Sequence, residues 1–180
     1  MGTPTTPAAV KLIVGVLAAS DALLDDSRRH LAQSFGPIDA CSTPTAWAVS
    51  EYYREEMGDS LLRQYFGFEH LIGPGKLAAV KQMSNSMEDT WRVAGRRQVN
   101  LDPGYVASTK LVLASTKDAA HRIYLSGGIY AEVTLFFTHG SFRPHAHTYP
   151  DYGAREALAF FNMVRGKYLQ QLRGTPPVIH

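Results

Sequence analysis

Cysteine is almost absent from this chain of 180 residues, since Cys41 is the only one. One cysteine cannot form an internal disulfide, so the sequence is typical of a reducing compartment, and we expect a cytoplasmic location. The first ten residues lack the positive and apolar segments of a secretory signal peptide. No apolar run approaches the roughly 20 residues that a spanning helix needs, so we expect no membrane partner.

A large excess of either charge is also lacking. Eighteen Lys and Arg residues against sixteen Asp and Glu residues leave a formal net charge of +2. This small value gives no indication of nucleic-acid binding. The length suits one domain with a sizeable core, so we predict a single domain over residues 11–173. A flexible leader over 1–10 and a flexible tail over 174–180 would flank it, and the oligomeric state is left open.

Nucleotide-binding motifs are missing as well. Gly75-Lys76 invites comparison with a phosphate-binding loop, but that loop needs a glycine where this chain has His70 and Ser or Thr where it has Leu77. The chain also contains no GxGxxG string. Both observations argue against phosphate-loop and Rossmann chemistry, and the cofactor remains unknown.

Apolar periodicity and helix-ending residues predict three main helices, near residues 22–35, 75–92 and 154–172. Gly36-Pro37 ends the first, Pro74 opens the second, and Gly174 follows the third. The expected inward stripe of the first helix contains Leu24, Ser27, Leu31 and Phe35, and that of the second contains Leu77, Val80, Met83, Met87 and Trp91.

The remaining segments predict an α+β fold with a largely antiparallel sheet. Strands are expected at 11–18, 38–49, 62–70 and 98–101, with a short turn or helix at 50–57. With the first two helices they give a β-α-β-β-α-β order, as in a ferredoxin-like core, to which a hairpin and the last helix are added. For residues 103–114, Asp102 and Pro103 favour a helix, whereas Leu111-Val112-Leu113 leaves a strand open.

Residues 121–137 predict a β-hairpin that turns at Ser126-Gly127-Gly128. A three-residue loop would place Arg122 opposite Glu132, and with the same register Ile123 opposite Ala131 and Tyr124 opposite Tyr130. This register gathers the polar side chains on one face and the apolar ones on the other. We therefore expect Arg122 and Glu132 to form a cross-strand ion pair.

Charged and hydrogen-bonding residues are concentrated between residues 96 and 152, in segments that otherwise resemble core strands and turns. Burying charge is costly unless it is paired, so this concentration predicts a cleft that binds a small anionic ligand bearing phosphate or carboxylate. The candidate catalytic residues are Glu132, His121 and Asp102. The candidate ligand-binding residues are Lys117, Arg122, Arg97, Asn100, Tyr124, Tyr149 and Asp151.

Other interpretations of these polar and aromatic residues stay open. The polar hairpin face could be a solvated sheet surface with a single cross-strand pair. Three nearby histidines resemble metal ligands, but we predict no metal site, and whether His139, His145 and His147 bind a metal is left open. The alternative function is a non-catalytic interaction module, whose aromatic binding surface would consist of Tyr52, Tyr53, Tyr149 and Tyr152.

Several strings resemble a bacterial family of domains of unknown function, number 4416, over about residues 11–172. They are Phe35-Gly36-Pro37-Ile38-Asp39, Tyr52-Tyr53 with Glu56-Met57-Gly58, Asn100 to Tyr105, Leu111 to Asp118, His121 to Leu125, and Thr148-Tyr149-Pro150-Asp151-Tyr152. The resemblance implies a bacterial cytoplasmic protein and brings no activity with it.

Overall fold

The central element of the fold is β1 (Val10–Ala18), all nine residues of which are buried. The computed structural model describes residues 2–47, 57–58 and 60–174. β1 pairs antiparallel with β4 (Leu62–Ile72) on one side and with β5 (Val99–Val106) on the other. A strand with partners along both edges and helices over both faces is expected to be largely apolar, which explains its run of β-branched residues.

The described strands form one sheet in the order β2-β4-β1-β5-β6-β8-β7, with β3 paired to β4 and β9 paired to β8. The outer strands are β2 (Ile38–Cys41), β3 (Thr45–Ala46), β6 (Lys110–Ser115), β7 (Ile123–Ser126), β8 (Ile129–Thr138) and β9 (Ser141–Arg143). Every pairing between these strands is antiparallel. The α+β prediction is confirmed, and β5-β1-β4-β2 has the strand order of the expected β-α-β-β-α-β core.

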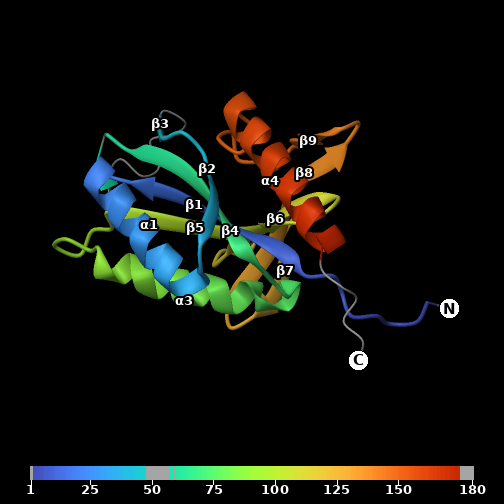
Figure 1. Cartoon of the computed structure of the whole chain (residues 1–180). Coiled ribbons are helices and arrows are strands. Elements are labelled where there is room, and N and C mark those ends of the chain that lie inside the picture. The colour runs from blue at the N-terminus through green and yellow to red at the C-terminus, as the bar shows by residue number, and fades with distance from the viewer. Residues whose placement is uncertain (1, 48–56, 59, 175–180) are drawn as a thin grey trace.

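Helices cover both faces of this sheet (Figure 1). α1 (Asp21–Phe35) and α3 (Leu77–Thr90) lie on one face, and α4 (Arg155–Gly174) lies on the other. A short 3₁₀ turn, Pro74–Lys76, leads into α3. All three predicted helices are therefore present within one or two residues of their expected bounds. The turn or helix predicted over 50–57 falls, except for Met57, outside the described residues.

The helix favoured for residues 103–114 is wrong, because these residues complete β5 and form β6. Pro103 is tolerated inside β5 because β6 pairs with β5 only from Gly104 to Val106. The preceding part of β5, which includes Pro103, is therefore an open edge on that side, and an open edge accommodates a residue without an N–H group. The apolar run Leu111–Leu113 indicated the second strand correctly.

The hairpin has the predicted register but a different turn. Ile123 lies opposite Ala131 and Tyr124 opposite Tyr130, as expected. Ser126 pairs with Ile129, so the loop contains only Gly127 and Gly128, which both have positive φ. A bulge at Leu125 compensates for the shorter loop, and two glycines suit such a turn because they adopt positive φ without strain.

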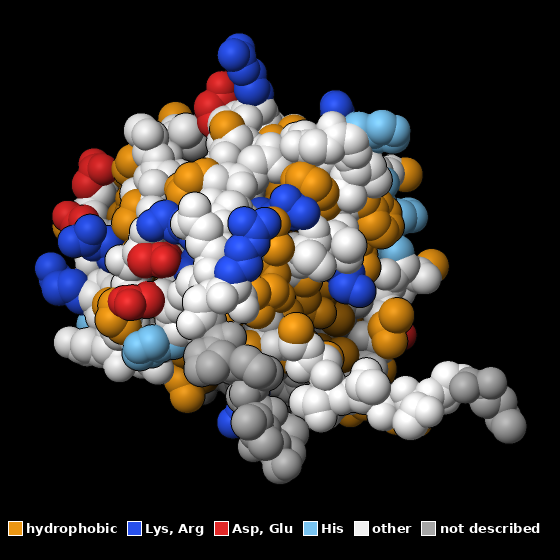
Figure 2. Space-filling view, turned by 45° about the vertical axis from the view of Figure 1, so that its right-hand side comes forward, with side chains coloured by type: hydrophobic (Ala, Val, Ile, Leu, Met, Phe, Trp, Pro, Cys, Tyr) orange, Lys and Arg blue, Asp and Glu red, His pale blue; other side chains and the backbone are white. Residues whose placement is uncertain are grey.

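The inward stripe predicted for the second helix is only partly the buried face of α3. The buried face of α3 consists of Leu77, Ala78, Val80, Lys81, Ser84 and Glu88, whereas Met83 is 48% exposed. In the hairpin the polar residues Glu132 and Thr134 are buried, and Ile123 is 74% exposed. Apolar side chains of both elements therefore reach solvent. On the face of the molecule that Figure 2 shows, hydrophobic side chains gather in a hollow bordered by Lys and Arg side chains.

Gly15 allows the α4 side of the sheet to close over β1. A Cβ atom at this position would lie 2.4 Å from the Tyr152 hydroxyl oxygen and 3.2 Å from Nη1 of Arg63. The Tyr152 ring cannot retreat easily, because it stacks on Phe161 at 5.5 Å between ring centroids. The absence of a side chain at this point of the central strand is therefore a packing requirement.

We predict that Gly15→Ala lowers the free energy of unfolding by about 1–3 kcal/mol, as overpacking does in a filled core. Urea denaturation monitored by circular dichroism measures this change. Gly166→Ala is the matched control, since Gly166 is exposed on α4 and its Cβ would meet nothing within 4 Å. That control should raise stability by up to about 1 kcal/mol through helix propensity. Equal effects of the two substitutions would contradict the packing argument.

Candidate functional site

Arg63 of β4 forms a buried ion-pair network on the α4 side of the sheet. Its Nη1 lies 3.0 Å from Oδ2 of Asp102, and its Nη2 lies 2.9 Å from Oδ2 of Asp151. The Tyr65 hydroxyl donates to the same Asp151 oxygen at 3.1 Å. Burial disfavours the charged guanidinium, but the two carboxylates outweigh burial and raise the pKa of Arg63. Arg63 therefore remains charged although it is only 4% exposed.

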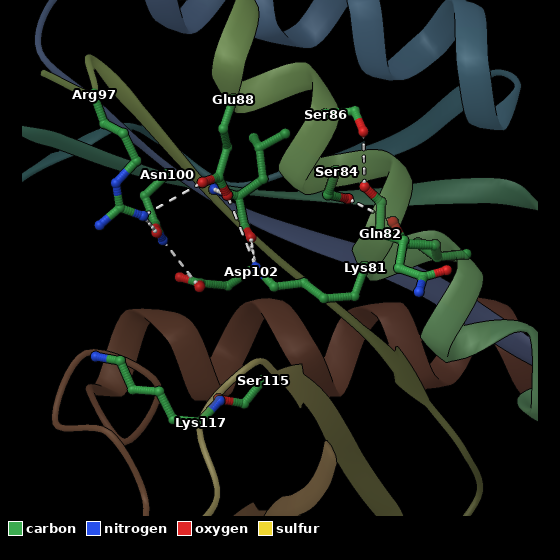
Figure 3. A network of polar contacts seen from close by, with 12 residues as sticks. Lys81, Gln82, Ser84, Ser86, Glu88, Arg97, Asn100, Asp102, Ser115 and Lys117 are labelled. Carbon is green, nitrogen blue, oxygen red and sulfur yellow. Dashed lines mark hydrogen bonds and ion pairs between the residues drawn. The ribbon is translucent and has the colours of Figure 1, made fainter. Parts of the chain in front are cut away.

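Two side chains of α3 form hydrogen bonds with the backbone groups at the open edge of β5 (Figure 3). Lys81 Nζ donates to the Leu101 carbonyl oxygen at 2.7 Å, and the Leu101 N–H donates to Oε1 of Glu88 at 2.8 Å. Lys81 and Glu88 also lie 3.8 Å apart as an ion pair. Buried backbone groups need partners, so these two charged residues replace the strand that is missing beside Leu101.

A chain of polar contacts runs from Glu88 to Asp102 (Figure 3). Arg97 Nη1 lies 3.4 Å from Oε2 of Glu88 and donates to Oδ1 of Asn100 at 3.1 Å. The Asn100 amide then donates to Oδ1 of Asp102 at 2.9 Å. Three of the residues in this chain, Arg97, Asn100 and Asp102, are among those predicted from the sequence.

The two carboxyl groups at the ends of this chain differ in acidity. Burial raises the pKa of Glu88 above its usual value, and Lys81 and the Leu101 N–H offset this only in part. Burial also acts on Asp102, but the charges of Arg63 and Lys81 and the hydrogen bonds from Arg63 and Asn100 hold its pKa below the usual value. Opposite displacements of two neighbouring carboxyl groups are typical of general acid and general base pairs.

A cleft of about 210 Å³ lies beside these residues, between α3 and the ends of β5, β6 and β8. Six of the ten predicted site residues line it, namely Asp102, Glu132, Lys117, Arg97, Asn100 and Tyr149. Lys81, Asn85, Glu88, Ser115 and Thr116 complete its polar wall. In Figure 3, Lys117 and Ser115 face the Arg97–Asn100–Asp102 group from the other side. Most of the residues predicted from the sequence thus line a single cleft.

Glu132 forms the predicted ion pair with Arg122. Nε of Arg122 lies 2.7 Å from Oε2 of Glu132, His121 Nε2 lies 3.3 Å from the same oxygen, and Thr134 donates to Oε1 at 3.2 Å. The Glu132 side chain is only 2% exposed, so the alternative of a solvated face does not apply to it. Arg122 Nη2 also donates to the Tyr149 hydroxyl at 2.6 Å, which connects the hairpin to the cleft wall.

Four of the predicted residues do not line the cleft. His121 and Arg122 contact its Glu132, and Asp151 and Tyr124 lie elsewhere. Asp151 is on the far side of the Asp102–Arg63 pair and lines a separate cavity. Tyr124 is 57% exposed and packs against Tyr130. Of the aromatic residues predicted for the alternative function, Tyr152 is buried at 1% exposure and Tyr149 is 41% exposed. Tyr52 and Tyr53 lie outside the described residues.

Histidines near the hairpin contact one another without forming a recognisable metal centre. His121 stacks on His147 with 4.3 Å between ring centroids, and His145 Nε2 lies 2.6 Å from the Val133 carbonyl oxygen. Over residues 2–47, 57–58 and 60–174 no three His, Cys, Asp or Glu side chains are grouped as a metal site.

Sequence reasoning missed Arg63, Lys81 and Glu88. Lys81 and Glu88 lie on one helical stripe with Leu77 and Ser84, since positions 77, 81, 84 and 88 are four, three and four residues apart. Charged residues in line with a buried leucine were therefore a usable indication that this stripe borders a polar site. Arg63 had no comparable indication, because it starts an alternating strand in which either face could be solvated.

The comparisons with known proteins identify the family. A family model described as a domain of unknown function, DUF4416, matches residues 8–168. The match covers most of the chain, which therefore belongs to this family, as its motifs indicated. No curated protein matches the chain, and no solved structure does. None of the described helices has the length and apolar character needed to cross a bilayer.

We predict that Arg63→Met lowers the free energy of unfolding by about 3–5 kcal/mol, because it leaves the carboxylates of Asp102 and Asp151 buried without their cation. Chemical denaturation at pH 7 measures the change. Arg29→Ala is the matched control, since Arg29 pairs with Asp26 on the surface of α1 with its side chain 66% exposed. That pair should contribute about 1 kcal/mol or less. A loss below 1 kcal/mol for Arg63→Met would contradict a stabilising network.

The depressed pKa of Asp102 predicts a specific pH dependence of stability. An unfolded aspartate has a pKa of about 3.9, so the contribution of Asp102 is present above that pH and is lost as the pH falls through the lower folded value. The stability difference between the wild type and Asp102→Asn should therefore shrink between pH 5 and pH 2. Urea denaturation across this range tests it, with Asp89→Asn at an exposed position as the surface control. A difference that grows on acidification would refute the assignment.

Proposed function

We propose that this protein binds a small anionic molecule, bearing a phosphate or carboxylate group, in the cleft between α3 and the ends of β5, β6 and β8. The observation that supports the proposal is the convergence of Lys81, Arg97 and Lys117 on one cleft of about 210 Å³. These residues come from α3, from the segment before β5 and from the loop after β6. Cations from three segments that meet at one small cavity suit a compact anion.

The carboxylates of the same cleft limit what the rest of the ligand can be. Glu88, Asp102 and Glu132 balance the three cations in number. A purely anionic ligand would be repelled by these groups, so we expect its remaining atoms to be hydrogen-bond donors such as hydroxyl groups. A phosphorylated polyol or a hydroxy acid has this combination.

In this proposal the protein is either an enzyme that converts this ligand or a sensor that responds to it. The enzymatic role is favoured by the opposite pKa displacements of Glu88 and Asp102, which line the same cleft. In such a pair the two carboxyl groups can take different roles in proton transfer. Glu132 and His121 hold Arg122 and the Tyr149 hydroxyl in place at the other wall.

We also propose that the protein is bacterial and works in the cytoplasm. The sequence motifs of its family and the presence of a single cysteine support this location.

A thermal-shift screen with inorganic phosphate, sugar phosphates and hydroxy acids tests the proposal. A ligand at about 100 times its Kd stabilises the folded state by about 2.7 kcal/mol, which raises the Tm of a protein of this size by about 5–10 °C. Lys117→Ala should abolish most of this rise. Lys110→Ala is the matched control, since Lys110 is exposed on β6 and does not line the cleft.

Two results would contradict the proposal. One is the absence of any shift with these compounds at concentrations up to about 10 mM, far above the usual range for metabolites. The other is a shift that Lys117→Ala and Lys110→Ala reduce equally, because an ion-pairing effect spread over the surface would not distinguish the two lysines.

A further inference from the structure

A second cavity, larger than the cleft, lies at the start of α4 and is named here the Trp47 cavity. Its volume is about 450 Å³, and its walls include Ser42, Thr45, Trp47, Arg63, Tyr65 and Phe160. It shares no lining residue with the cleft. Its volume falls within the range of about 300–1,000 Å³ that small-molecule sites occupy.

Each buried charge at the floor of the Trp47 cavity already has a partner of opposite charge. Arg63 is held by Asp102 and Asp151, and Asp151 accepts from both Arg63 and the Tyr65 hydroxyl. A charged ligand would have to compete with these buried pairs, which is costly because a displaced partner would be left without its counterion. The remaining charged residue, Glu156, is exposed in the first turn of α4, where solvent screens it.

The polar groups of the wall are also largely occupied. Ser42 Oγ accepts from the Tyr65 N–H at 2.9 Å and donates to the Thr43 carbonyl oxygen at 3.2 Å. Thr45 Oγ1 donates to the Arg63 carbonyl oxygen at 3.4 Å. The wall therefore offers a ligand mainly apolar contact, supplemented by the free lone pairs of these hydroxyl oxygens.

Three aromatic side chains provide most of that apolar contact. The Trp47 ring centroid lies 5.0 Å from the guanidinium carbon of Arg63, and the backbone N–H of Trp47 donates to the Leu61 carbonyl oxygen at 2.7 Å. Tyr65 and Phe160 are stacked with 6.1 Å between ring centroids and 25° between their planes. The flat faces of aromatic rings that line a cavity suit a planar aromatic partner, which can form offset-stacked or edge-to-face contacts with them.

We propose that the Trp47 cavity is a second ligand site, which binds a neutral, planar aromatic molecule against Trp47, Tyr65 and Phe160. This inference goes beyond the function proposed for the cleft and is independent of it.

Three isosteric probes test the charge and the shape of the ligand, namely benzamide, benzoate and benzamidinium. Trp91→Phe leaves Trp47 as the only tryptophan, because the chain contains two, so its fluorescence reports on the cavity. We expect a saturable change with benzamide at about millimolar concentration, as for a small fragment. Benzoate and benzamidinium should each bind at least about tenfold more weakly, because each meets a charge that is already paired.

A cavity-filling variant and a matched control locate the binding. Ala46→Leu introduces a larger side chain into the wall of the cavity from an exposed position in β3 and should weaken benzamide binding at least about tenfold. Ala79→Leu, at an exposed position of α3 outside the cavity, should leave it unchanged. Isothermal calorimetry on the chain that retains Trp91 gives the same comparison if Trp91→Phe does not fold.

The outcomes separate this inference from the proposed function. Benzamide binding that persists in Lys117→Ala supports two independent sites. The inference is overturned if no probe binds, if benzoate or benzamidinium binds more tightly than benzamide, or if Ala46→Leu and Ala79→Leu behave alike. None of these results depends on whether an anion binds in the cleft.

Discussion

The pairing of Arg63 with two carboxylates connects three parts of the chain that are distant in sequence. Asp102 belongs to β5, Asp151 to the loop before α4, and Arg63 itself to β4. Gly15 of the central strand leaves the space that this group and Tyr152 occupy. The geometry of both cavities follows from this arrangement, because Asp102 lines the cleft while Arg63 and Asp151 line the Trp47 cavity.

The cleft exists because two neighbouring strands separate. β5 and β6 pair only at Gly104–Val106 and diverge beyond it, which exposes the backbone of Leu101. In most sheets another strand would satisfy this backbone, whereas here Lys81 and Glu88 do so from a helix. Burying two charges to replace backbone hydrogen bonds contributes little net stability.

Much of the fold followed from local patterns in the sequence. Gly36-Pro37 and Pro74 marked the helix boundaries, and the apolar run at 11–18 indicated the central strand. The hairpin register followed from the separation of polar and apolar side chains. The error at residues 103–114 arose because Asp102 and Pro103 resemble a helix start locally, while the tolerance of β5 for proline depends on where β6 stops pairing.

The site was predictable to the extent that charge patterns reflect burial. Six residues between 96 and 152 converge on the cleft because β5, β6 and β8 are neighbours in the sheet. Arg63 could not be anticipated, since its two partners come from elements whose relative positions depend on the tertiary fold. Tyr124 was misplaced because β7 is the last strand of the sheet, where the side chain is exposed to solvent. Local periodicity contains no information about either effect.

The position of α4 has a consequence for the order in which the molecule assembles. The central strand is near the beginning of the chain, and its α4 side carries the buried ammonium group of Lys11, which donates to Gln171 at 3.0 Å. The Tyr168 hydroxyl likewise donates to the carbonyl oxygen of Ala9 at 2.8 Å. During synthesis, α1 and α3 can cover their face of the sheet while the opposite face still lacks its helix. Contacts that span about 160 residues close last, so a nascent chain ends its folding only after residue 171 has left the ribosome.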